Sequence, residues 1–464
     1  MRLGKRVAGS VLWNTCMVRL HCGLVRQICC VVAALGTSSL LAEALPHEIG
    51  IRLPGAAEAT DLEVVDPAEL SPTQFSEAQA ASGPVPKTPV APLGTLPGEF
   101  EKQSAILIGS GQLADELPDV FARIALLTRG RVSLIALAQG DEGRRHAQQV
   151  LADQHIASPH LHFVNAPHNS MWARDFGPLT VRQHDGHSAL VDTWYTSADR
   201  MEDDAIPQLL AETLTMPIVP ASLFLDGGNV LTNGRGLFVA TYDLVDRNLQ
   251  PDRDAELIRL NLGQLFGASE VVFLEPLIGE PTAHVDMFCT FVSADTVVVA
   301  SIDPKDDAEN ARILNHNAAR LASMRVGRKR LRVVRMQMPS HDDAVWRSYT
   351  NVVYANGLLM VPTYPEKDPD GSRAALALYK GLLPDWQVEP IDAEALAQLG
   401  GALHCITMNM ASIDRLPPWI VTAKSDHPLT RWVQEQDAEF QRDFFGIENG
   451  IHRHVIEPAI ETDR

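Results

Sequence analysis

One local pattern, a polar cluster followed by a strand, a turn and a returning strand, occurs four times along the chain. Three of the turns carry Asp-Gly or Asn-Gly, beginning at Asp185, Asn233 and Asn356, and the remaining turn lies near Asp295. Such turns between apolar runs predict β-hairpins. A strand-turn-strand unit that recurs at a roughly even interval is typical of repeated units packed around a common axis. The four units span residues 174–191, 226–239, 284–299 and 348–361.

Each unit opens with a polar residue, and a further polar position follows a Gly-Gly pair near the C-terminus. These five residues are Asp175, Asp226, His284, Asn351 and Cys405. In units packed around one axis, the same end of each first strand points to the centre, so the five side chains are expected to converge. The alternative is an ordinary α/β sheet whose strands begin with turn-forming residues, because Asp, Asn and Gly are common in turns. A histidine and a cysteine at equivalent places favour convergence.

A shared pocket would make Cys405 a candidate nucleophile, because an imidazolium such as that of His284 lowers a thiol pKa and can protonate a leaving group. The carboxylates of Asp175, Asp226 and Asp286 exceed the needs of a cysteine protease, and their negative charge raises a thiol pKa. A cationic substrate with several N–H donors explains this excess. A guanidinium fits, since it is planar, positive and pairs with carboxylates through two hydrogen bonds. Two carboxylates would hold it flat, with its central carbon toward the sulfur.

Four neighbouring residues are expected to serve the structure. Trp172 is predicted to form a pocket wall, and Arg174 an ion pair. Cys289 follows Phe288 on a strand, so it is predicted to be a core thiol. His404 has apolar neighbours and is predicted to pack in the interior.

Composition excludes several classes of function. The chain has 464 residues and a formal net charge of −19, which disfavours a nucleic-acid partner. Outside the N-terminal segment the only cysteines are Cys289 and Cys405, which excludes a disulfide framework. His284 and Asp286 could form a metal pair, but the chain has no Cys-x-x-Cys or His-Glu-x-x-His motif outside that segment, so a metal site is disfavoured.

The N-terminal segment, residues 1–44, begins with basic residues, continues into the apolar run 28–35 and ends in Ala42-Glu43-Ala44. This pattern predicts a secretory signal cut after Ala44. An uncleaved membrane anchor is the alternative. Residues 45–96 are rich in Pro and Ala, which predicts a flexible linker, and residues 97–464 form the predicted catalytic domain. The protein is therefore expected to be secreted or periplasmic, or anchored to a membrane.

Apolar periodicity in the body predicts strands that alternate with helices, which is typical of an α/β fold. Predicted helices span 117–127, 142–153, 204–214, 254–265, 307–321 and 429–444. Predicted strands outside the repeated units span 105–108, 132–137, 162–164, 271–274 and 331–335.

Five motifs in the body, taken together and in order, resemble the bacterial, Porphyromonas-type peptidylarginine deiminase and agmatine deiminase family. They are Met171–Pro178, Asp226–Asn229, His284–Phe288, Ser348–Asn351 and His404–Thr407. The resemblance spans residues 97–410. It implies a pentein α/β propeller, with five ββα-type units around a pseudo-fivefold axis. It also implies hydrolysis of a guanidino group to a ureido group with release of ammonia, without a metal or an organic cofactor.

The resemblance also implies a role for each matched residue. Cys405 is the expected nucleophile, which forms an amidino-cysteine adduct, and His284 is the expected general acid and base. Asp175 and Asp286 are expected to grip the guanidinium. Three further positions are expected near the substrate: Asp226, Trp172 and Asn351.

Departures from the family pattern leave the substrate open between agmatine, arginine in a peptide and free arginine. Ala283 stands where the family has glycine, Met408-Asn409-Met410 replaces a Gln-rich stretch, and residues 104–108 lack the tryptophans of agmatine deiminases. Putrescine biosynthesis and citrullination are the corresponding settings. The oligomeric state is not predicted.

Two alternative functions are consistent with the same residues. An amidinotransferase would resolve the cysteine adduct with an amine instead of water, and a catalytically silent module would bind cationic ligands in the same acidic pocket. A papain-like hydrolase is disfavoured, because there the cysteine usually precedes its histidine, whereas here Cys405 follows His284.

Overall fold

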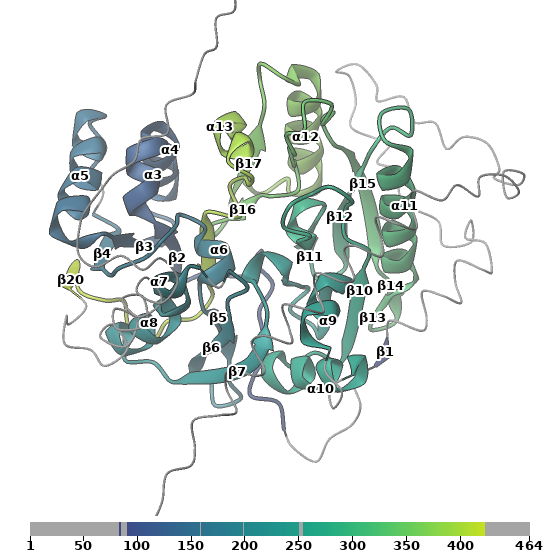
Figure 1. The fold of residues 1–464 in the computed structure, drawn as a ribbon, viewed down its shortest axis with the longest axis horizontal. Helices are drawn as coiled ribbons and strands as arrows, with labels where there is room; N and C mark the ends of the chain where they lie inside the picture. The colour runs from purple at the N-terminus through teal and green to yellow at the C-terminus, as the bar shows by residue number, and fades with distance from the viewer. Residues whose placement is uncertain (1–82, 85–90, 158, 198, 250–253, 423–464) are drawn as a thin grey trace, which may run out of the picture. The chain divides into compact units, whose positions relative to one another are not determined.

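The computed structural model describes residues 83–84, 91–157, 159–197, 199–249 and 254–422. Within these residues the chain has the predicted mixed α/β fold (Figure 1). Six sheets are present in the described part of the chain, and five of them share one arrangement of strands. In each of the five, a central strand pairs antiparallel with one neighbour and parallel with the other.

Four of these sheets contain the hairpins that the repeated pattern predicts, each extended by a later parallel strand. The first three-stranded set is β5 (Leu179–Arg182), β6 (Ser188–Trp194) and β7 (Ile218–Phe224); the second is β8 (Leu231–Thr232), β9 (Leu237–Thr241) and β10 (Glu270–Leu274), with β1 (Gly83–Pro84) at its edge; the third is β11 (Cys289–Ser293), β12 (Thr296–Ser301) and β15 (Arg332–Gln337); the fourth is β16 (Val353–Tyr354), β17 (Leu358–Thr363) and β18 (Gln387–Asp392). A separate hairpin joins β13 (Arg325–Val326) to β14 (Lys329–Arg330).

The fifth sheet joins the two ends of the described body. Its strands are β19 (Thr407–Met410), β2 (Ala105–Gly109), β3 (Ser133–Ala138), β4 (Leu161–Asn165) and β20 (Ile420–Thr422). β19 pairs antiparallel with β2, which places Thr407 opposite Ile108. Because Cys405 lies just before β19, this pairing brings the end of the body, and the predicted nucleophile, to its first long strand.

The helices connect the strands and cover the sheets; in Figure 1, α11 lies along β12 and β15. The predicted helices agree with α4 (Pro118–Thr128), α5 (Gly140–Asp153), α10 (Ala255–Phe266) and α11 (Ala308–Ser323). The predicted helix 204–214 is divided into α7 (Met201–Asp204) and α8 (Ile206–Leu214), with Pro207 in the first turn of α8. Sequence periodicity missed α3 (Ser110–Glu116), α9 (Tyr242–Asn248), α12 (Pro369–Leu382) and α13 (Glu394–Gln398).

The polar clusters differ from the expected strand starts. Three of them form single helical turns that precede the strands: α6 (Ala173–Phe176), η2 (Gly227–Asn229) and η3 (Val285–Met287). Asp226 and His284 are extended and stand at the N-caps of η2 and η3. A helical turn after an extended residue turns successive side chains in different directions, so His284 and Asp286 need not share one face of a strand.

Several predicted segments lie outside the described residues: the leader 1–44, most of the linker 45–96, and the helix 429–444. Of the linker, residues 83–84 and 91–96 are described, and Leu93 N–H donates to the Gln264 carbonyl at 2.7 Å. Within the described ranges, no helix has the length and apolar character needed to cross a membrane.

Candidate active site

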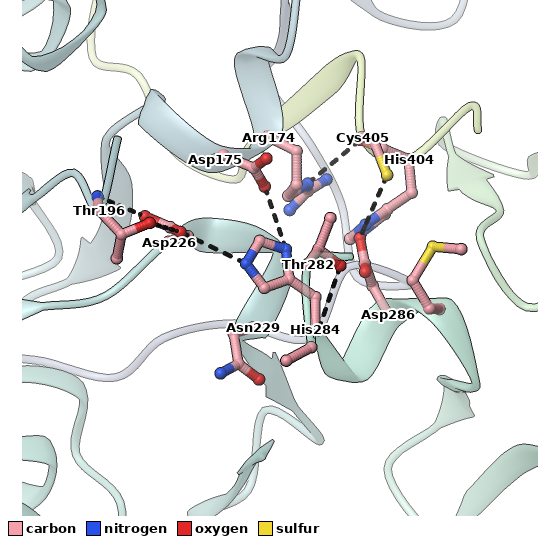
Figure 2. Close-up of polar contacts among 12 residues, drawn as sticks. Arg174, Asp175, Thr196, Asp226, Asn229, Thr282, His284, Asp286, His404 and Cys405 are labelled. Carbon is pink, nitrogen blue, oxygen red and sulfur yellow. Dashed lines mark hydrogen bonds and ion pairs between the residues drawn. The ribbon is translucent and has the colours of Figure 1, made fainter. Parts of the chain in front are cut away.

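The structure brings the five leading polar residues of the sequence pattern into one region. Asp175 lies on α6, Asp226 at the N-cap of η2, His284 at the N-cap of η3, and Cys405 before β19 (Figure 2). The turns themselves touch, since α6 contacts η2 and η2 contacts η3. Asn351 completes the set through its contact with Cys405.

His284 lies between two carboxylates. Its Nδ1 is 3.5 Å from Asp175 Oδ1, and its Nε2 is 3.4 Å from Asp226 Oδ2 (Figure 2). Asp226 is itself oriented by Thr196, whose backbone N–H donates to Oδ1 at 3.0 Å and whose hydroxyl donates to Oδ2. Burial alone would lower the pKa of His284, but the carboxylates of Asp175 and Asp226 outweigh it and raise this pKa to about 10. His284 is therefore an imidazolium at neutral pH.

The surroundings of Asp175 favour its uncharged form, whereas those of His284 favour its charged form. Burial raises the pKa of its carboxyl to about 7, although His284 opposes the rise, and Asp226 and Asp286 add to it. A cation placed beside Asp175 would reverse this effect, because it would stabilise the charged carboxylate.

His404 is buried in the interior, as predicted from its apolar neighbours, but its ring also makes two ion pairs that the sequence did not indicate. Its Nδ1 is 2.7 Å from Asp286 Oδ2, and its Nε2 is 2.9 Å from Glu99 Oε2. Glu99 also accepts a hydrogen bond from Arg174 Nη1 at 2.5 Å, the ion pair expected of Arg174. Burial would raise the pKa of Glu99, but Arg174 and His404 outweigh it and lower this pKa to about 2.

Cys405 is buried, and its Sγ lies 3.8 Å from Asp286 Oδ2 (Figure 2). Asn351 Nδ2 donates to the sulfur at 3.4 Å, while Asn351 Oδ1 accepts from the His404 backbone N–H at 2.9 Å. Burial, with the charges of Asp286 and Asp175, raises the pKa of the thiol well above its usual value. The free protein therefore holds Cys405 as a thiol, and added positive charge is needed to form the thiolate.

Two carboxylate oxygens in this region have no hydrogen-bond partner, although they are buried: Asp175 Oδ1 and Asp286 Oδ1. Buried polar atoms are normally paired, so such a pair calls for an explanation. Both accept hydrogen bonds and belong to groups that carry negative charge when ionised. They suit a cationic ligand with N–H donors.

Gly228 allows His284 and two carboxylates to approach its backbone closely. A Cβ at this position would lie 2.5 Å from His284 Nδ1, 2.6 Å from Asp175 Oδ1 and 3.3 Å from Asp286 Oδ2. Any larger residue would therefore displace His284 or a carboxylate. The sequence motif Asp226–Asn229 signalled a turn but not this close approach.

The Gly-Gly pair before Cys405 accommodates Trp172. A Cβ at Gly401 would lie 2.4 Å from Trp172 Cζ3 and 3.1 Å from Cys405 Cβ. The indole therefore packs against the backbone beside the nucleophile, in the position expected of a pocket wall. Cys289 is fully buried in the core, and burial raises the pKa of its thiol, as expected for a structural cysteine.

The segment before His284 contains a residue in an unusual conformation. Ala283 has φ +59°, in the left-handed region that favours glycine. Its N–H donates to Glu280 Oε2 at 2.7 Å, and its carbonyl accepts from Thr241 Oγ1 at 2.7 Å. These two bonds hold Ala283 in place where the family pattern has glycine.

A cavity of about 30 Å³ is lined by Glu99, Arg174 and Thr180 among others, but not by Cys405 or His284. The volume holds little more than a water molecule, so it does not serve as the substrate pocket. Across the described residues, no group of three or more His, Cys, Asp and Glu side chains has the arrangement of a metal site.

Comparison with known proteins agrees with the resemblance seen in the sequence. Residues 95–411 match the family model of the Porphyromonas-type peptidyl-arginine deiminases. A curated relative, the putative agmatine deiminase of Selenomonas ruminantium, is 26% identical over 315 residues, which cover 59% of this chain and 83% of the relative.

Solved structures are similar over most of their length. The putative arginine deiminase of Porphyromonas gingivalis is 26% identical, with a TM-score of 0.59, and the match covers 68% of this chain and 98% of that one. The agmatine deiminase of Enterococcus faecalis is 20% identical, with a TM-score of 0.59 and coverage of 70% and 99%, and this match supports the fold alone.

Proposed function

Because this chain belongs to the Porphyromonas-type peptidyl-arginine deiminase family, we propose that it is a cysteine-dependent hydrolase of guanidino groups. It hydrolyses the guanidino group of agmatine to the ureido group of N-carbamoylputrescine, or that of an arginine side chain to the ureido group of citrulline, and releases ammonia. The observation that carries the proposal is the pair of buried carboxylates with oxygens that make no hydrogen bond: Asp286 lies 3.8 Å from the Cys405 sulfur through Oδ2 and keeps Oδ1 free, and Asp175 Oδ1 has only a long ion pair with His284. No organic cofactor or metal takes part in the proposed reaction.

Substrate binding activates the nucleophile. The guanidinium donates N–H groups to Asp175 Oδ1 and Asp286 Oδ1, and its charge offsets the carboxylates that raise the thiol pKa. Cys405 then loses its proton to solvent and becomes a thiolate. Trp172, Asp226 and Asn351 complete the site as wall, partner of His284 and partner of the sulfur.

The first chemical step forms the covalent adduct. The Cys405 thiolate attacks the central carbon of the guanidinium and forms an S–C bond, which gives a neutral tetrahedral intermediate. His284 then transfers its proton to one amino group, the C–N bond breaks and ammonia leaves. The product of this step is a cationic amidino-cysteine, and His284 is left neutral.

The second step restores the enzyme. His284 takes a proton from water, and the resulting hydroxide attacks the carbon of the adduct. The S–C bond breaks, the carbon keeps the oxygen, and a ureido product leaves after losing a proton. Cys405 returns as a thiolate and His284 as an imidazolium. The overall reaction consumes one water and yields the ureido compound and ammonium.

The propeller architecture belongs to the same proposal. Five ββα-type units around a pseudo-fivefold axis would account for the five sheets of common strand order and for the pairing of β19 with β2. Contacts among α6, η2 and η3 support the convergence of successive units at one centre.

The proposed organisation and location rest on the sequence pattern. Residues 1–44 would be a secretory signal or anchor, 45–96 a linker, and 97–464 the catalytic domain of a secreted or periplasmic protein, with or without a membrane anchor. The net charge of −19 supports a cationic substrate and disfavours nucleic acid. Mass spectrometry of the N-terminus of protein expressed in a secreting host would test cleavage after Ala44.

Incubation with agmatine, free arginine and an arginine-containing peptide tests the activity, with ammonia and ureido product measured separately. Cys405→Ser should abolish turnover, whereas Cys289→Ala should retain it, because Cys289 is a fully buried core thiol that takes no part in the proposed reaction. Turnover by Cys405→Ser would sink the assignment. Ligand binding without product would favour the silent module, and product that requires an added amine would favour the amidinotransferase.

A further inference from the structure

His404 is held between two carboxylates, one at each ring nitrogen. Nδ1 lies 2.7 Å from Asp286 Oδ2, and Nε2 lies 2.9 Å and 3.0 Å from the two oxygens of Glu99. An ionised carboxylate only accepts hydrogen bonds, and a neutral imidazole has a single N–H. Both bonds are satisfied together only if His404 is an imidazolium.

The charges around His404 are consistent with that state. Glu99 comes from the segment before β2, Asp286 from η3, Arg174 from α6 and Cys405 from the loop of His404 itself. Burial and Arg174 lower the pKa of His404, but Glu99 and Asp286 outweigh them and raise it. Asn351, the remaining polar neighbour, contacts the backbone N–H of His404 rather than its ring.

The position of His404 also decides which oxygen of Asp286 is free. The ring occupies Oδ2, which is the oxygen nearest Cys405 Sγ, and leaves Oδ1 without a partner. The hydrogen bond to the ring fixes the orientation of the Asp286 carboxylate. Without this bond, the carboxylate is free to rotate, and Oδ1 is no longer held in one place.

We propose that Glu99 and His404 are positioning residues: Glu99 keeps His404 charged, and charged His404 holds the Asp286 carboxylate in the orientation that presents Oδ1 to the guanidinium. The inference rests on the proposed function for the identity of the substrate. It adds Glu99 to the candidate site residues, although Glu99 lies outside the five motifs that resemble the deiminase family.

Nuclear magnetic resonance tests the charge state without any substrate. With ¹⁵N-labelled histidine, the His404 signals are those lost in His404→Asn. At pH 8 both ring nitrogens should carry protons in the unmodified chain, and His404 should be neutral in Glu99→Gln. The matched control is Glu101→Gln, since Glu101 pairs with Arg182 and Arg235. A neutral His404 in the unmodified chain, or a still charged one in Glu99→Gln, would overturn the proposal.

Binding tests the consequence for Asp286 without requiring turnover. In the Cys405→Ser background, Glu99→Gln should weaken agmatine or arginine-peptide binding at least about tenfold at pH 8. The loss should shrink at pH 6, where an ordinary histidine is protonated without help. An equal loss at both pH values would mean a merely structural role for Glu99 and would overturn the proposal, as would no loss.

Turnover by the unmodified chain separates the two hypotheses. If the charge and binding results hold but no substrate yields ammonia, the proposed function fails and the positioning role stands as a binding role. If ammonia is released but Glu99→Gln binds the ligand normally at pH 8, the positioning role of Glu99 fails and the proposed function stands. In an active chain, Glu99→Gln should raise KM at pH 8 more than it lowers kcat.

Discussion

The two histidines of the site, His284 and His404, are similarly buried, at 5% and 3% exposure. The distances from their ring nitrogens to the paired carboxylates nevertheless differ. His284 lies 3.4 and 3.5 Å from its carboxylates, beyond an ordinary N–H···O hydrogen bond, whereas His404 lies 2.7 and 2.9 Å from its carboxylates. Burial alone therefore does not explain the difference. In the tight cluster around His404 both ring nitrogens of the histidine are paired, although Asp286 Oδ1 makes no hydrogen bond.

The loose cluster lacks partners. Asp175 Oδ1 is buried without a hydrogen bond and has only the 3.5 Å ion pair with His284, and a side chain at Gly228 would collide with both residues. A site that must bind and release a cation needs charges that are held near each other but not saturated. The contrast favours the proposed assignment, in which His284 reacts with the substrate and His404 supports the site.

The largest effect should distinguish these roles directly. His284→Asn should lower kcat by about 10⁴-fold, because the general acid and base is lost, with little change in folding stability. His404→Asn should instead lower the free energy of unfolding by about 3 kcal/mol, because it breaks a buried charge network. Steady-state kinetics and urea denaturation measure the two quantities. Equal destabilisation by both changes would break the comparison.

Gly228→Ala adds a single carbon to the loose cluster. Because that carbon would overlap His284 and Asp175, kcat/KM should fall by about 10²-fold, the usual cost of displacing a reacting group by about 1 Å. The control is Gly381→Ala, since nothing lies within 4 Å of a Cβ at that position of α12. The control should keep full activity. Unchanged kinetics in Gly228→Ala would mean that His284 and Asp175 can move away from the added carbon without loss of activity.

Much of the fold could be predicted from local sequence. The convergence of the polar residues could be predicted as well, because it follows from that fold. Asn-Gly and Asp-Gly turns between apolar runs identified the hairpins, and their even spacing identified which polar residues would meet. The single helical turns at η2 and η3 were missed, because a three-residue segment has no periodicity to detect. α12 was also missed; it begins at Pro369, and Asp368 caps its N-terminus.

The supporting cluster was far harder to predict. The partners of His404 lie 118 positions away, at Asp286, and 305 positions away, at Glu99. A sequence window around His404 contains only apolar neighbours and therefore predicted packing. The available signal was a pair of acidic residues, Glu99 and Glu101, at the start of the first long strand of the body.

The pH dependence should separate the two groups within the loose cluster. In the proposed mechanism Asp175 must be ionised to hold a guanidinium, and its pKa is raised to about 7, so kcat/KM should fall by about a further tenfold per pH unit below that value, in addition to the fall caused by protonation of the Cys405 thiolate. His284 must be protonated to act as the acid, and its pKa of about 10 places the alkaline limb there. A bound cation lowers the pKa of Asp175, so kcat should fall less in acid than kcat/KM. A flat kcat/KM between pH 5 and 7 would contradict this role of Asp175.

The smallest expected effect concerns the segment that leads into His284. Ala283 and Ala344 both have a left-handed backbone, with φ +59° and +62°, but Ala344 is exposed and has no contact with the site. Replacement of either by glycine relieves the same kind of strain. Each change should raise the free energy of unfolding by about 0.5 kcal/mol, since part of the relief is offset by the greater entropy of glycine in the unfolded chain.

The two glycine variants should nevertheless differ in activity. Ala283 is tied by Glu280 and Thr241, and glycine would loosen the backbone that sets the loosely paired His284. Ala283→Gly should therefore lower kcat by about twofold, because a less ordered base is less often in the reactive geometry. Ala344→Gly should leave kcat unchanged. If both variants keep full kcat, the two carboxylates alone orient His284, and the backbone conformation at Ala283 does not affect its position.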